Sequence, residues 1–151
     1  MNAMTKLLCG LILFVTLTGC IAEDYDFTPP TVTLMETDSV DSVELTETNI
    51  DWRGENGKPL EKETKEVVDF ARKQKELTFP SGQQVDVLFD SEDFAVEELR
   101  AFLWLGNEKW QLDIGEDRSF TLPRGKGSYV LEVDLQTDRG SAQYVGNIVI
   151  E

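Results

Sequence analysis

The architecture of this chain is set by one stretch, GSYVLEVDLQTDRGSAQYVGNIVI, residues 127–150. Apolar side chains occupy positions 129, 131, 133 and 135, and mostly polar side chains lie between them. This period of two is typical of a β-strand with one buried face and one exposed face. Residues 137–140 form a turn signal, and residues 144–150 are again rich in apolar side chains. The stretch therefore predicts an antiparallel β-hairpin at the end of the chain.

Strand patterns with turn residues between them continue upstream of this hairpin. They cover residues 31–36, 43–52, 77–79, 85–89, 99–105, 110–114 and 119–122. The segment 99–105 is apolar on both faces, which favours a central strand covered on both sides. Residues 61–77 differ, because Val67, Phe70, Ala71 and Gln74 recur at spacings of three and four. That spacing predicts one short helix inserted between strands.

The motif Gly127-x-Tyr129-x-Leu131-x-Val133, followed by a glycine-containing turn and a final strand, resembles bacterial immunoglobulin-like and fibronectin-like modules. The resemblance implies an all-β fold, an antiparallel immunoglobulin-like β-sandwich of about seven or eight strands over residues 31–151. Tyr129 would then enter the penultimate strand. A second likeness begins at residues 79–83, FPSGQ, and is to a small bacterial family of β-sandwich proteinase inhibitors.

The beginning of the chain has the pattern of a secretory leader. Lys6 is followed by an apolar run over residues 7–18, which is too short for a durable membrane span. The tetrapeptide Leu17-Thr18-Gly19-Cys20 resembles the lipobox of bacterial lipoproteins. The resemblance implies that residues 1–19 are removed and that Cys20 carries a diacylglycerol. The alternative is an ordinary signal cleavage that leaves a cysteine near the new terminus by chance.

A lipid on Cys20 would anchor the chain to the cell membrane or envelope, on its extracytoplasmic side. Residues 20–30 then form an acidic, Pro-containing stem in front of the domain. Ile21 stands where inner-membrane lipoproteins of double-membrane bacteria commonly carry Asp, so the resemblance implies outward sorting. Cys9 leaves with the leader. The folded part then holds no free thiol for a disulfide, a metal or a nucleophile.

Composition excludes several functional classes. Fourteen Lys and Arg face 29 Asp and Glu, and the net charge of −15 disfavours binding to nucleic acid. Histidine is absent, which removes Ser-His-Asp catalysis and most zinc sites. Gly125-Lys126-Gly127 precedes a strand and lacks the helix of a phosphate-binding loop. We expect no enzyme, no cofactor and no metal. Calcium stays open at two groups of acids, Asp90, Glu92 and Asp93, and Asp113, Glu116 and Asp117.

Three tryptophans are candidates for ligand contact. Trp104 and Trp110 lie in strand patterns with apolar neighbours, so we expect both in the core. Trp52 lies beside Arg53 and a glycine loop, and we expect it to be exposed and to bind a ligand.

The sequence predicts a lipid-anchored, non-enzymatic interaction module, whose loops at 53–59 and 90–97 contact an envelope protein or polymer. The alternatives are a carbohydrate-binding or wall-polymer-binding module and a proteinase inhibitor.

Overall fold

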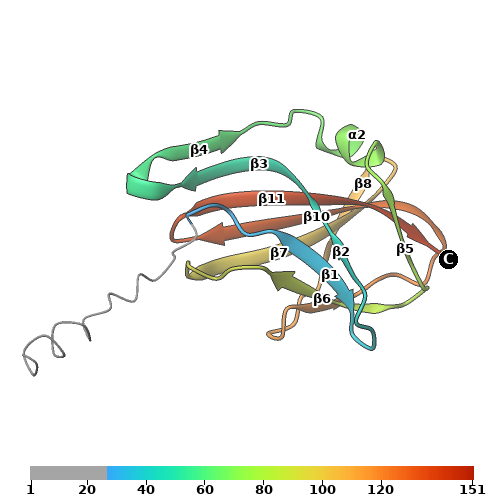
Figure 1. Ribbon diagram of the computed structural model, residues 1–151. Helices are drawn as coiled ribbons and strands as arrows, with labels where there is room; N and C mark the ends of the chain where they lie inside the picture. Colours follow the sequence, from blue (N-terminus) through green and yellow to red (C-terminus); the bar gives the residue numbers. More distant parts are fainter. Residues whose placement is uncertain (1–26) are drawn as a thin grey trace, which may run out of the picture.

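The structure, a computed structural model, describes residues 27–151 and is an all-β fold with two sheets in a sandwich-like arrangement (Figure 1). The predicted leader 1–19, Cys20 and most of the predicted stem 20–30 lie outside the described residues. Within residues 27–151, no helix has the length and apolar character needed to span a membrane.

The smaller sheet has four strands. Their order is β2 (Ser42–Glu44), β1 (Val32–Glu36), β6 (Gln84–Phe89) and β9 (Ser119–Thr121), and all neighbours are antiparallel. Val32, Leu34, Val85 and Val87 alternate with more exposed residues, so that one face of this sheet is buried.

The larger sheet has seven strands. Along it run β4 (Pro59–Lys62), β3 (Thr46–Arg53), β11 (Gly140–Ile150), β10 (Gly127–Thr137), β7 (Val96–Leu105) and β8 (Glu108–Leu112). All of these pairs are antiparallel, and β5 (Glu76–Phe79) adds a parallel pairing to the end of β11. Residues 27–151 also contain a 3-10 turn, η1 (Glu55–Gly57), and one short helix, α2 (Val67–Arg72).

The predicted C-terminal hairpin is confirmed. Strands β10 and β11 pair without interruption from Gly127 opposite Ile150 to Thr137 opposite Gly140. Gly140 has a φ of +137°, and a Cβ there would collide with the carbonyl oxygen of Asp51 on β3. The turn of the hairpin therefore requires glycine at this position, because β3 passes too close for any side chain.

Two predicted elements have the wrong boundaries. The segment 43–52 is divided between two sheets, since β2 belongs to the smaller sheet and β3 to the larger, with buried Leu45 between them. The helix predicted over 61–77 is reduced to α2, because residues up to Lys62 pair with β3 and residues from Glu76 pair with β11. Sheet pairing outweighs helical spacing at both ends of this segment.

The main core lies between the two sheets and takes the inward residues of both hairpin strands, including Leu131, Val133, Tyr144 and Ile148. A second, smaller apolar cluster lies on the other side of the large sheet. There α2 packs its Ala71 against Val130 of β10 and Val145 of β11. The helix thus covers one end of the sheet's outer face and leaves the rest of that face to polar side chains.

Candidate functional site

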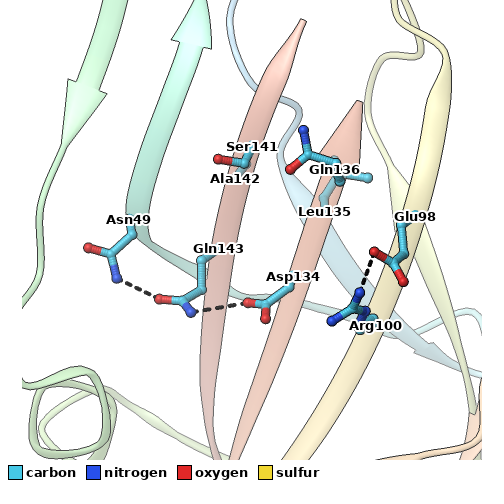
Figure 2. A pocket seen from close by; sticks show the side chains of 9 residues that line it. All are labelled: Asn49, Glu98, Arg100, Asp134, Leu135, Gln136, Ser141, Ala142 and Gln143. Carbon is cyan, nitrogen blue, oxygen red and sulfur yellow. Dashed lines mark hydrogen bonds and ion pairs between the residues drawn. The ribbon is translucent and has the colours of Figure 1, made fainter. Parts of the chain in front are cut away.

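Polar side chains from four neighbouring strands line a hollow of about 350 Å³ on the outer face of the large sheet (Figure 2). We call this surface the polar platform. It consists of Asn49 on β3, Ser141 and Gln143 on β11, Asp134 and Gln136 on β10, and Glu98 and Arg100 on β7.

The platform is built by strand register. Asp134 lies directly opposite both Gln143 and Arg100, on the two strands that flank β10. Gln136 lies in the same way between Ser141 and Glu98. Because side chains alternate along a strand, these residues project outward while Leu131, Val133 and Leu135 project into the core. The pattern that buries the hairpin therefore also assembles two polar rows on its outer face.

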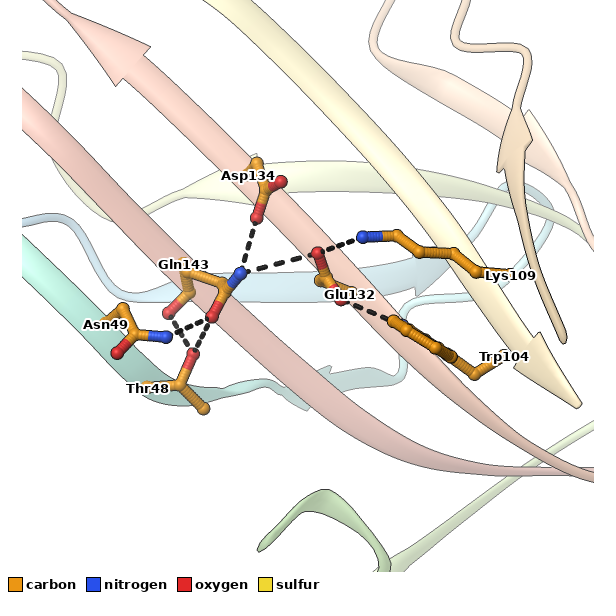
Figure 3. A network of polar contacts seen from close by, with 7 residues as sticks. All are labelled: Thr48, Asn49, Trp104, Lys109, Glu132, Asp134 and Gln143. Atoms are coloured by element: carbon orange, nitrogen blue, oxygen red, sulfur yellow. Dashed lines mark hydrogen bonds and ion pairs between the residues drawn. The ribbon is translucent and has the colours of Figure 1, made fainter. Parts of the chain in front are cut away.

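The Gln143 amide is held at both ends by a hydrogen-bond network (Figure 3). Its Oε1 accepts hydrogen bonds from Asn49 Nδ2 at 2.7 Å and Thr48 Oγ1 at 2.9 Å. Its Nε2 donates to Asp134 Oδ1 at 3.1 Å and to Glu132 Oε1 at 3.4 Å. The network therefore fixes the orientation of Gln143 and of two platform neighbours before any ligand arrives.

Glu132 lies beside Asp134 on the same outer face of β10 and is only 4% exposed. Its Oε2 accepts a hydrogen bond from Trp104 Nε1 at 2.8 Å, and its Oε1 accepts one from Lys109 Nζ at 2.8 Å. The ammonium group of Lys109 also lies over the rings of Phe102 and Trp104, at 4.2 and 5.0 Å from their centroids. A buried carboxylate with a cation and several donors around it is strongly held in place.

The pKa of Asp134 is raised above its ordinary value of 3.8, mainly because burial disfavours the charged carboxylate. The hydrogen bond from Gln143 acts in the opposite direction, and the negative charge of Glu132 adds to the rise. Lys109 and Arg100 lower the pKa by weaker attraction. The folded state therefore disfavours the charged form of Asp134.

This shift predicts a pH-dependent effect of the substitution Asp134→Asn. A raised folded-state pKa means that the stabilisation due to Asp134 is complete below its unfolded pKa and is lost as pH rises through its folded pKa. The unfolding free energy of the wild type, relative to Asp134→Asn, should therefore fall as pH rises above about 4. Urea denaturation from about pH 3 to pH 7 measures the difference. A difference that stays constant or grows with pH would contradict the assignment.

The prediction that Trp52 is exposed is wrong. Trp52 is 1% exposed and lies in the main core, where its ring meets the edge of Phe94 at 5.5 Å between centroids. The alternation of β3 turns Trp52 inward together with Ile50, whereas the neighbouring Arg53 reaches the surface. The polar neighbours in sequence gave no sign of this, because they lie on the other face of the same strand.

The other two tryptophans are both half-buried, with different neighbours. Trp110 packs against the main core and meets Tyr129 edge to face, with 6.2 Å between ring centroids. Trp104 packs against the small core cluster under α2 on the outer face, and not against the main core between the sheets. Its indole N–H joins the network through Glu132.

The two groups of acids considered for calcium do not converge. Asp90 accepts a hydrogen bond from the backbone N–H of Thr31 at 2.7 Å, and Glu92 pairs with Arg118. Asp117 accepts bonds from the backbone and hydroxyl of Ser119, and these bonds lower the pKa of its carboxyl. Across residues 27–151, no three acidic side chains lie together in a way that could hold a metal ion.

The sequence contained one signal for the platform. The outward positions of β10, Glu132, Asp134 and Gln136, are polar without interruption, whereas Val130 marks the part that α2 covers. The platform residues of β3 and β7 lie 30 or more positions before those of β10 in the sequence. Only the register of the folded sheet shows that these residues are neighbours.

Comparisons with known proteins leave the family of this chain open. No protein-family model matches the sequence, and a search of curated proteins finds no relative.

Proposed function

We propose that this protein is a bacterial lipoprotein, anchored through Cys20 on the extracytoplasmic side of a membrane, that acts as a non-enzymatic binding module. The observation that carries the proposal is the polar platform, a preorganised set of donors and acceptors on a rigid sheet. Such sets hold a ligand in one orientation at a small entropic cost. The lipid would keep this weak binding surface close to other envelope components.

An immunoglobulin-like class of sandwich is supported by Tyr129. This residue enters β10, the penultimate strand, and its hydroxyl donates to the carbonyl oxygen of Gly125 at 2.7 Å. Immunoglobulin-like folds place a tyrosine near the start of the corresponding strand, with its hydroxyl bonded to backbone a few residues upstream.

The start of the described chain supports a defined orientation of the anchored domain. Tyr144 donates a hydrogen bond to the carbonyl oxygen of Pro30 at 2.6 Å, and the guanidinium of Arg139 lies over the ring of Phe27. The chain therefore enters at the end that holds the β10–β11 turn. A lipid on Cys20, seven residues before Phe27, would lie within about 25 Å of this end.

The loops first considered for partner binding gather at the same end. Asp138 in the β10–β11 turn accepts a hydrogen bond from the backbone N–H of Ala95, and its carbonyl accepts one from Arg53. Arg139 donates to the carbonyl oxygen of Asp93. An anchored domain would turn these loops toward the bilayer. We therefore assign binding to the polar platform and not to the loops at 53–59 and 90–97.

Photo-crosslinking in the native host tests this assignment. A photo-reactive amino acid at position 136, on the platform, should form an ultraviolet-dependent conjugate with an envelope component. The same amino acid at position 126, in an exposed turn away from the platform, is the matched control and should not form this conjugate. Adding Arg100→Ala should weaken the conjugate from position 136. Identical patterns from both positions, or none from 136, would contradict a binding role for the platform.

A further inference from the structure

We infer that the polar platform binds a short segment of a neutral, polyhydroxylated chain, that is, a carbohydrate polymer. This inference rests on the proposed function, because it names the ligand class of the same surface. Four properties of the platform carry it: its charge balance, its mixture of donors and acceptors, the state of its backbone, and its size.

The charges of the platform are largely matched within the protein. Arg100 Nη2 lies 2.6 Å from Glu98 Oε2, and Lys109 Nζ lies 2.8 Å from Glu132 Oε1 on the same outer face, next to the platform. Among the described residues no cation forms an ion pair with Asp134, which accepts a hydrogen bond from Gln143 and is half-buried. A strongly charged ligand would find at most one unmatched charge here and would have to lose its own hydration. The balance therefore favours a neutral ligand.

The hydrogen-bonding groups of the platform alternate between donors and acceptors. The amide of Gln136 carries both kinds of group, and the hydroxyl of Ser141 donates and accepts. The Gln143 amide already has partners at both ends, so it orients its neighbours and does not itself offer groups to a ligand. On the neighbouring strand β7, Glu98 adds a carboxylate with two acceptor oxygens, and Arg100 adds a guanidinium group with several N–H donors. A sugar hydroxyl is likewise a donor and an acceptor. Rows of such groups on a ligand would match the two rows of the platform.

The backbone of the platform disfavours a peptide strand as the ligand. Peptides that add to a sheet need free N–H and C=O groups at an edge strand. The platform lies on the face of β3, β11, β10 and β7, which are all paired on both sides. The strands of this sheet that pair on one side only are β4, β8 and β5, and none of them contributes a side chain to the hollow. A ligand on the platform must therefore bind through side chains.

The size of the hollow fits a short stretch of polymer. Its volume of about 350 Å³ is at the small end of ligand sites, which commonly span about 300 to 1,000 Å³. Glu98, Arg100 and Gln136 are exposed, so the site does not enclose its ligand. None of the residues that line the hollow is aromatic, and the ring of Phe102, two residues after Arg100 on β7, has the Lys109 ammonium group over it. Hydrogen bonds without ring stacking predict weak binding, with a dissociation constant on the order of 0.1 to 1 mM.

Calorimetric titration of the full chain tests the inference. The protein is extracted in a detergent without a sugar headgroup and titrated with hexasaccharides of glucose linked α-1,4, of glucose linked β-1,4, and of N-acetylglucosamine. At least one should bind saturably. Arg100→Ala and Gln136→Ala should each weaken that binding about tenfold, which corresponds to about 1.4 kcal/mol. Gln111→Ala, an exposed amide on β8 outside the platform, is the matched control and should leave it unchanged.

Three results would overturn the inference. No hexasaccharide binds at about ten times the highest expected dissociation constant, or one binds but Arg100→Ala and Gln136→Ala leave its binding intact. The third is that hexalysine, titrated as a cationic comparison ligand, binds and no hexasaccharide does. A positive crosslink from position 136 together with any of these results would retain the platform as a binding surface and reject only the carbohydrate. Loss of the crosslink as well would reject the proposed function itself.

Discussion

Replacing Glu132 with alanine is expected to lower the free energy of unfolding by about 2 to 3 kcal/mol. Glu132 is 4% exposed, and its removal leaves Lys109 Nζ and Trp104 Nε1 without their shared acceptor. The cost comes mainly from the loss of the buried carboxylate as acceptor for the Trp104 N–H, and Lys109 adds less because its side chain is 34% exposed. Urea denaturation followed by circular dichroism measures the loss.

Two further variants separate this explanation from a general effect of losing an acid. Glu98→Ala removes an exposed partner of Arg100 on the same face and should cost at most about 1 kcal/mol. The double substitution Glu132→Leu with Lys109→Met removes both charges and should recover part of the stability lost in Glu132→Ala. Equal losses in Glu132→Ala and Glu98→Ala would show that the network does not hold the sheet as described.

Replacing Trp52 with alanine is expected to cost about 3 to 5 kcal/mol, the range for removing a buried aromatic side chain. Trp52 is 1% exposed, and the cavity would open beside Phe94 in the main core. Trp52→Phe should cost much less, because the buried indole Nε1 has no hydrogen-bond partner to lose. Thermal and urea denaturation of both variants measure the difference.

The same pair of variants tests the corrected position of Trp52. If the residue belongs to the core, Trp52→Phe should keep the crosslink from position 136 and any carbohydrate binding at full strength. If Trp52→Phe folds normally but loses the crosslink or the carbohydrate binding, Trp52 belongs to a binding surface instead.

The fold could be predicted where the sequence pattern is local. The hairpin of β10 and β11 follows from strict alternation and a glycine turn, and its uninterrupted register agrees with that pattern. The inserted helix could be predicted only in part, because α2 keeps the positions that touch Val130 and Val145. The ends of the predicted helix join the large sheet through pairings with distant strands, and such pairings leave no local trace.

The candidate site was largely hidden in the sequence for the same reason. Trp52 was expected at the surface because polar residues flank it, but flanking residues on a strand occupy the opposite face. The platform combines side chains from residues 49, 98 and 143, which are brought together by strand order and register. The outward acids and amide of β10 were visible, yet their partners on β7 and β11 depend on the register.

Anchoring through Cys20 is the claim on which the proposed presentation of the platform depends, and intact-mass spectrometry of protein from native membranes tests it most directly. The account predicts a chain that begins at Cys20 and carries the added mass of a diacylglycerol, with or without a third acyl chain. The variant Cys20→Ala should lack this mass and remain uncleaved at Gly19. Native protein that begins elsewhere, or that has an unmodified Cys20 sulfur, would contradict the account.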